Sequence, residues 1–264
     1  QHNFRFQPLD EQRLKLVEMN RAYEIYKERF ADAGNWTFVF VGNFIPEDLK
    51  SKIEMYLGGL PSLNKKETFR DLGIGPPAGI INKEVYKGSE PKSAVSLIFT
   101  GLFEYNRHNR NDIFALQKLL NIRLRETLRE DMGGVYGFGV SPSLKHFPCS
   151  RYQLSISFGC SPGNVDKLVA AALQVLDSVK QNGCSTDNLL KVKESLLKER
   201  EVNLKQNNFW LSALLQSDMN GENILELEDF NKQVESLTSE DFKRLANAYF
   251  NTKNYATFVL YPEK

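Results

Sequence analysis

A break in composition between residues 58 and 80 does most to limit what this chain can fold into. Five glycines and three prolines lie within those residues, and both residue types interrupt helices and strands. We therefore predict a linker at residues 58–78, which joins a front segment (1–57) to a larger segment (79–264). Only the larger segment holds enough expected strands and helices for a complete layered domain.

The front segment has the pattern of a helix, a strand and a second helix. Apolar residues recur at helical spacing across residues 10–30, and the aromatic, β-branched run 36–41 is typical of a strand covered on both faces. Proline in the first turn favours another helix over 46–57.

A weak internal repeat bears on how this front segment should be interpreted. Residues 30–41 resemble residues 250–260, since each stretch has an aromatic helix end, a polar turn and a Thr-Phe-Val strand. Chance similarity between two helix–strand joints is one interpretation. The other is that residues 1–57 are the C-terminal remnant of a domain of which residues 79–264 are a complete copy.

The larger segment is predicted to be α+β, with a mixed or antiparallel sheet backed by helices. Asn182-Gly183 is expected to end one helix, and Thr238–Asp241 resembles a capping box that begins another. The expected strands are 81–86, 94–100, 134–141, 152–158 and 255–261, and the expected helices are 112–128, 161–182, 185–219 and 239–250.

Composition argues against some classes of partner. Lys and Arg number 34 against 33 Asp and Glu, so no global field attracts nucleic acid or anionic lipid. The apolar runs are far shorter than the ~20 residues that span a bilayer. We therefore expect neither a nucleic-acid partner nor a membrane partner. Three scattered cysteines are expected to be free.

No metal site or catalytic signature is expected in this chain. His2, His108 and His146 are the only histidines, and none lies in H-E-x-x-H or in its inverse, H-x-x-E-H. His108 is expected in a polar turn and His146 in a hairpin loop. Nucleophile-elbow, phosphate-loop and dinucleotide motifs are also missing. Gly133-Gly134 and Gly137-x-Gly139 are interpreted as strand entry and close packing.

The most informative stretch is residues 121–141, in which a charged helix end turns through two glycines into a strand. Arg129 lies near the helix end and Tyr136 follows seven residues later, at the start of the strand. Taken alone, Arg129 is a cation that complements the helix dipole, and Tyr136 is an amphipathic strand residue.

This Arg…Gly-Gly-x-Tyr junction resembles the last domain of the pitrilysin/insulinase family of zinc peptidases, the inverzincins. The similarity continues at residues 38–44, 56–62, 155–159, 190–201 and 255–264, so that the match extends across nearly the whole chain. The resemblance implies a metallopeptidase-like α/β roll of the LuxS/MPP type. It further implies a four-domain enzyme whose two halves enclose a chamber.

The resemblance also implies roles. In this family an H-x-x-E-H motif in the first domain binds zinc, and an Arg and a Tyr of the last domain hold the substrate peptide. Those positions match Arg129 and Tyr136, which are therefore expected to be substrate-binding, with no catalytic and no metal-binding residue in this chain. A guanidinium offers a planar fork of donors, and a phenol can donate to a developing oxyanion.

Zinc is accordingly expected in the full-length enzyme and not in this chain. The expected partners are a peptide substrate and either the N-terminal half of the same protein or a zinc-bearing partner subunit. Two alternatives stay open: a non-catalytic assembly subunit, like the family's respiratory-complex core proteins, or a peptide-binding module with no hydrolytic partner. Because bacterial relatives are often exported, the resemblance suggests the periplasm or cell envelope.

Overall fold

The computed structural model describes residues 3–63 and 68–263, and the chain divides into two compact units. The first comprises residues 1–75 and 205–222, and the second comprises residues 76–204 and 223–264. The division after Gly75 lies inside the predicted linker. That residues 1–57 are a domain remnant stays a prediction.

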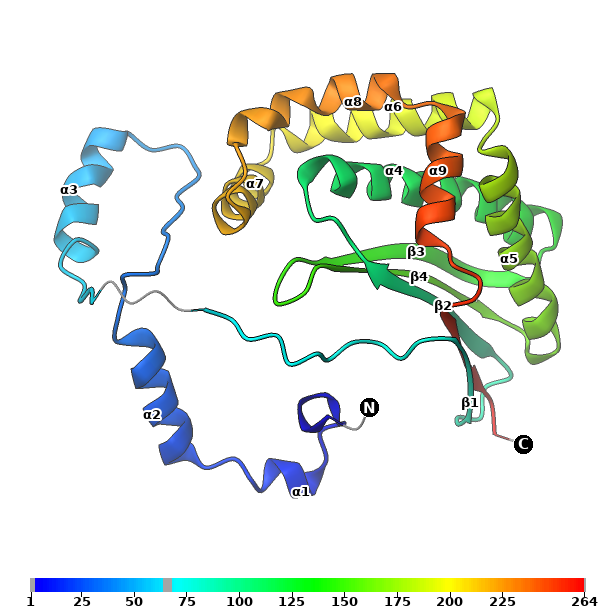
Figure 1. Cartoon of the computed structure of the whole chain (residues 1–264), viewed down its shortest axis with the longest axis horizontal. Coiled ribbons are helices and arrows are strands. Elements are labelled where there is room, and N and C mark those ends of the chain that lie inside the picture. Colours follow the sequence, from blue (N-terminus) through cyan, green and yellow to red (C-terminus); the bar gives the residue numbers. More distant parts are fainter. Residues whose placement is uncertain (1–2, 64–67, 264) are drawn as a thin grey trace. The chain divides into compact units, whose positions relative to one another are not determined.

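The second unit is built on one five-stranded mixed sheet (Figure 1). Strand β1 is parallel to β5, and every other neighbouring pair is antiparallel. This confirms the predicted α+β class. In spatial order the strands are β1 (Ile80–Tyr86), β5 (Tyr255–Tyr261), β2 (Ser93–Leu102), β4 (Arg151–Cys160) and β3 (Val135–Lys145).

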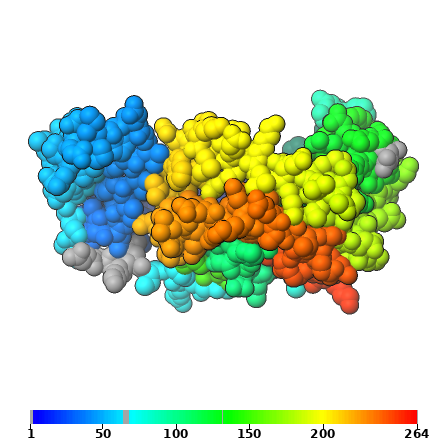
Figure 2. Space-filling view, turned by 90° about the horizontal axis from the view of Figure 1, so that it is seen from above, coloured from blue at the N-terminus to red at the C-terminus, as the bar shows by residue number. Residues whose placement is uncertain are grey.

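Helices of this unit lie on one face of the sheet (Figure 1). Viewed from that side, α5, α8 and α9 contribute to the outer surface (Figure 2). The helical elements are α4 (Arg107–Leu124), the π-helix η2 (Arg125–Asp131), η3 (Pro162–Asn164), α5 (Val165–Asn182), α6 (Thr186–Asn203), η4 (Ile224–Asp229), α8 (Phe230–Ser236) and α9 (Ser239–Tyr249).

The core lies between these helices and the sheet. In β4, Leu154 and Ile156 are completely buried toward the helices, whereas Gln153 and Ser157 are exposed on the opposite face. Strand β2 shows the same alternation. Burial of such side chains stabilises by about 25 cal/mol per Å² of apolar surface. The helix-free face, called here the open face, carries small and polar side chains on β4, and the large apolar side chains of Phe258 and Leu260 lie exposed there on β5.

Side chains of α4 close the outer edge of β3. The Gln117 amide donates to the Val140 carbonyl (2.8 Å), and the Asn121 side-chain oxygen accepts from the Val140 N–H (3.2 Å). Pro142, two residues further along the same edge, has no N–H to offer. The edge is thus protected against pairing with another chain, and β3 is fixed to α4.

Local signals at the helix ends are confirmed. Thr238 and Asp241 form the predicted capping box of α9, with the neighbouring Leu237 and Phe242 both buried. Gly183 ends α5 with φ of +66°, and a Cβ atom there would lie 2.2 Å from the Ser239 carbonyl oxygen. Glycine is therefore required where α5 meets α9.

The predicted strand at residues 36–41 is wrong, because these residues form no strand. The equivalent strand in the repeat, β5, pairs on both sides with β1 and β2. Residues 36–41 have no such neighbour among the residues described, and a strand exists only through its pairing.

Two predicted helices are each divided in two. The predicted helix over residues 10–30 becomes two helices, α1 (Glu11–Leu14) and α2 (Met19–Phe30). Neither helix has a buried residue, so no shared packed face joins them. The predicted helix over 185–219 becomes α6 and α7 (Asn207–Asn220), which belong to different units. Helix α3 (Pro46–Tyr56) forms as predicted.

No helix of the described residues is both long enough and apolar enough to cross a bilayer.

Candidate functional site

Arg129 lies in the π-helical continuation of α4. The seven residues Arg125–Asp131 adopt the wider π geometry, which is rare and is often found at functional sites. Leu128 is completely buried and fixes this turn to the core, while the Arg129 side chain is exposed. Its guanidinium forms no ion pair with any residue described, so its donors are available to a ligand.

The connection to the strand is short and tightly bonded. The Gly133 N–H donates to the Arg129 carbonyl (3.1 Å), and the Gly134 N–H donates to the Leu128 carbonyl (3.2 Å). Gly133 has φ of +57°, and a Cβ on Gly134 would lie 2.9 Å from Leu168. The predicted strand entry and close packing are confirmed for this pair, but Gly137 and Gly139 have open space around them.

Tyr136 occupies an irregularity in the β3–β4 ladder. Val135 pairs with Cys160 and Gly137 pairs with Gly159, so Tyr136 is the extra residue of a bulge. Bulges redirect side chains and are common beside active sites. The Tyr136 side chain is 70% exposed, and its hydroxyl lies 3.1 Å from the Ser161 hydroxyl. The strand position was predictable, but the bulge was not.

A hollow of about 580 Å³ adjoins Tyr136 on the open face. We call it the Tyr136 hollow. It is lined by residues 87–90 and 92 of the β1–β2 loop, by residues 93–94 at the start of β2, and by Tyr136, Gly159 and Leu260. A shallower depression continues from it over β2, β4 and β3, and shares Ala94 and Gly159 with it. Its other residues include Ser96, Gly137 and Ser157.

Arg129 does not line this hollow. The structure thus brings Tyr136 to the hollow, and it leaves Arg129 exposed on the preceding turn, with no hydrogen bond or cation–π contact between these two described side chains. Loop residues 87–92 were not singled out as a site from the sequence. The sequence feature that could have drawn attention to this loop is Gly88, between the two expected strands. In the structure Gly88 has φ of +94° in the turn.

The two histidines within the described residues belong to no cluster that could hold a metal ion. His2 lies outside the described residues. His108 is in the first turn of α4 and not in the predicted polar turn, with Nε2 3.6 Å from an Asp112 carboxylate oxygen. His146 is in the predicted β3–β4 loop and stacks on Tyr105 with ring centroids 4.5 Å apart. No three His, Cys, Asp or Glu side chains gather within the described residues, so the donor set for zinc is not met there.

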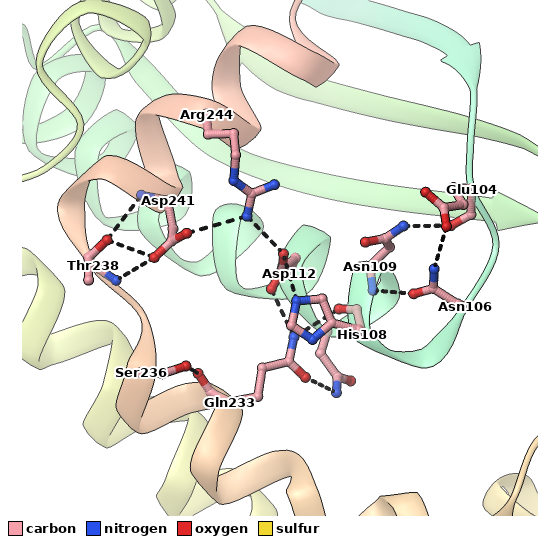
Figure 3. Close-up of polar contacts among 11 residues, drawn as sticks. Glu104, Asn106, His108, Asn109, Asp112, Gln233, Ser236, Thr238, Asp241 and Arg244 are labelled. Atoms are coloured by element: carbon pink, nitrogen blue, oxygen red, sulfur yellow. Dashed lines mark hydrogen bonds and ion pairs between the residues drawn. The ribbon is translucent and has the colours of Figure 1, made fainter.

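A buried polar cluster that the sequence did not reveal lies on the helical side (Figure 3). Asp112 of α4 is 2% exposed. One of its oxygens accepts from the Gln233 amide (2.8 Å), and the other lies 3.3 Å from an Arg244 nitrogen. Gln233 also bonds Asn111 and the His108 carbonyl. These contacts hold α8 and α9 against α4, and the cluster does not have the character of a metal site because its partners are donors.

Comparison with known proteins gives the class of protein that this fold and surface define. Residues 17–196 match the family described as the peptidase M16 inactive domain, which is more than half of the chain. The chain therefore belongs to the inactive-domain family of the M16 peptidases, as the resemblance predicted.

Relatives are longer proteins. A zinc protease PQQL-like protein of Arabidopsis thaliana is 27% identical over 231 residues, which is 81% of this chain and 24% of that protein. Stromal processing peptidase of Pisum sativum is 30% identical over 132 residues, 48% of this chain and 10% of that one. The chain thus spans about a quarter or less of these relatives.

Solved structures share the fold. The periplasmic protease PqqL from Escherichia coli superposes with a TM-score of 0.80 at 19% identity, over 97% of this chain and 28% of that one. The peptidase M16 inactive domain from Pseudomonas fluorescens superposes with a TM-score of 0.71 at 19% identity, over 97% of this chain and 60% of that chain. The ferredoxin protease FusC, solved as a mutant in complex with Arabidopsis ferredoxin, superposes with a TM-score of 0.78 at 16% identity, over 98% of this chain and 28% of that chain.

Proposed function

We propose that this chain is the C-terminal, substrate-binding part of a zinc-dependent metalloendopeptidase. The observation that carries the proposal is the bulged Tyr136, which presents an exposed phenol beside a hollow on the open face of an M16-family domain. The shallow depression that continues from the hollow suits an extended peptide. Membership in the M16 family supports the peptidase class, and a peptide-binding module with no hydrolytic partner is the alternative.

In this proposal the chain binds and orients the peptide. The Tyr136 hydroxyl donates a hydrogen bond to a peptide carbonyl oxygen, and that bond strengthens as the oxygen gains negative charge. The exposed Arg129 guanidinium donates hydrogen bonds from its planar fork of N–H groups to a neighbouring carbonyl or carboxylate of the same peptide. Both groups act as hydrogen-bond donors, and no proton transfer is part of this role.

Hydrolysis itself is assigned to the part of the protein outside this chain. The described residues do not provide a zinc donor set, and the chain spans about a quarter of its PQQL-like relative. We propose that the zinc-bearing N-terminal half of the same protein, or a partner subunit, supplies the metal and encloses the peptide against the open face. The first unit has apolar side chains that such a neighbour could cover, including Met19 (81% exposed) and Phe6 (69% exposed).

Replacing Tyr136 and Arg129 in the full-length enzyme tests the proposal. Tyr136→Phe removes one hydroxyl and little volume, so kcat/KM for peptide hydrolysis should fall by ~10- to 1,000-fold, the upper end matching the loss of an oxyanion donor. Arg129→Lys keeps the charge but loses the planar fork, so turnover should also fall. Steady-state kinetics on a fluorogenic peptide measure both effects.

Two variants serve as matched controls. Tyr86→Phe removes the hydroxyl of a tyrosine that is 50% exposed on β1 and outside the hollow, and Arg125→Lys alters an exposed arginine of the same π-helical turn. Both should retain normal kinetics. Unchanged hydrolysis in the Tyr136 and Arg129 variants, with a lowered unfolding temperature, would show that the pair is structural. An upstream sequence lacking H-x-x-E-H would favour the non-catalytic assembly subunit.

A further inference from the structure

The Tyr136 hollow contains one charge that the described residues leave uncompensated. Among its lining residues, Lys92 and Glu90 form an ion pair, and the hydrogen bond from Lys92 lowers the pKa of the Glu90 carboxyl. These two side chains therefore neutralise each other. Lys87 has no ion pair with any residue described, so its ammonium gives the hollow a net positive charge.

The backbone around Lys87 is fixed at the rim of the hollow. The Lys87 N–H donates to the Tyr261 carbonyl at the end of β5 (2.9 Å), and the Gly88 carbonyl accepts from the Glu263 N–H (2.8 Å). These two bonds hold the start of the β1–β2 loop. The ammonium is therefore presented from a fixed position, on a stem of four carbons that can adjust to a ligand.

The floor of the hollow carries no charge. Ala94, Gly159 and Leu260 come from three different strands, and they offer only backbone groups and apolar side chains. A group that enters meets this floor, the Tyr136 phenol and the Lys87 ammonium. A carboxylate on a short apolar stem suits all three: the stem packs on the apolar floor, and the carboxylate oxygens accept hydrogen bonds from the phenol and the ammonium.

We propose, resting on the function proposed above, that Lys87 is a specificity-determining residue that binds a carboxylate of the peptide held at Tyr136. The carboxylate belongs either to an Asp or Glu side chain or to the free C-terminus of the peptide. Peptides with a carboxylate that reaches the hollow are therefore preferred over neutral or cationic ones.

The experiment compares peptides in the full-length enzyme. One peptide carries Glu, Gln or Lys at each position in turn, and each version is made with a free and with an amidated C-terminus. The kcat/KM for one Glu position, or for the free C-terminus, should exceed that of its neutral counterpart by ~2- to 5-fold. Lys87→Met should abolish this preference, and Lys87→Glu should reverse it toward Lys or the amide. The position that responds identifies the source of the carboxylate.

Lys83→Met is the matched control, since Lys83 is an exposed lysine of β1 that does not line the hollow. It should leave the preference unchanged, whereas raising the ionic strength should weaken it. If Lys87→Met keeps the wild-type preference while Tyr136→Phe still slows hydrolysis, this inference is overturned and the proposed function stands. If neither substitution has an effect, both are overturned.

Discussion

Gly101 and Tyr152 show how one cross-strand pair can depend on the absence of a side chain. They face each other across β2 and β4, and the Tyr152 ring occupies the space above Gly101. The Tyr152 hydroxyl donates to the Tyr249 carbonyl (3.0 Å) and fixes the ring against α9. Burial raises the pKa of Tyr152 to about 12, with a smaller contribution from Tyr249. The phenol is therefore held neutral in its buried position.

Replacing Gly101 with Ala should destabilise the protein. The new Cβ would lie 2.6 Å from a ring carbon of Tyr152, and the ring cannot move without losing its bond to Tyr249. We expect a loss of ~1–3 kcal/mol in the free energy of unfolding, as for other overpacked cores. Urea denaturation followed by fluorescence measures it.

Gly139→Ala is the control for that substitution. Gly139 lies on β3 with nothing within 4 Å of its Cβ position, so stability should stay the same or rise slightly. Equal effects of the two substitutions would show that the contact with Tyr152 is not the cause.

At the scale of the elements, the contact of α8 and α9 with α4 depends on polar side chains as well as on the apolar core. Gln233 of α8 and Arg244 of α9 both reach the buried Asp112 of α4 (Figure 3). A buried carboxylate is costly unless its hydrogen bonds are satisfied. The short helix α8 is thereby fixed to a helix more than a hundred residues away in the sequence.

Gln233→Leu should loosen this junction. The substitution removes the 2.8 Å bond to Asp112 and leaves a buried carboxylate oxygen without that donor. We expect a loss of ~1–3 kcal/mol in the free energy of unfolding. Hydrogen exchange of the α8 amides should increase in parallel.

Ser236→Ala is the matched control on the same helix. The exposed Ser236 hydroxyl donates to the Gln233 carbonyl (2.9 Å) within the last turn, so its loss should change stability little. If Gln233→Leu has no larger effect than Ser236→Ala, the polar cluster does not hold the helices together.

At the scale of the whole molecule, this chain resembles one part of a larger enzyme. It superposes on 28% of the PqqL chain, and its first unit contains helices without a buried residue. Exposed apolar side chains of this kind mark surfaces at which a protein contacts a neighbour.

The isolated chain should bind no zinc at stoichiometric level and should not cleave peptides. Its sequence lacks the H-x-x-E-H ligand set, and its described residues contain no cluster of three metal-ligating side chains. Elemental analysis of the purified protein and a fluorogenic peptide assay measure the two properties. One tightly held zinc per chain would contradict the prediction.

Local patterns in the sequence determined most elements of the second unit. The alternation in β4, the capping box at Thr238 and the glycine after α5 each depend on neighbours within a few residues, so they could be predicted. The position of Tyr136 at a helix–strand junction was accessible for the same reason. Its role came from the resemblance to a family, and that role stays a proposal.

Only the tertiary structure decided which segments pair and what surrounds the candidate site. Residues 36–41 have the composition of a strand but no neighbour to pair with among the described residues. The long helix expected over 185–219 is divided into two helices, and these belong to different units. The Tyr136 bulge depends on the pairing of β3 with β4, and the assembled sheet brings Lys87 and Tyr136 to one hollow. Contacts between residues far apart in sequence create these features, and no local pattern encodes such contacts.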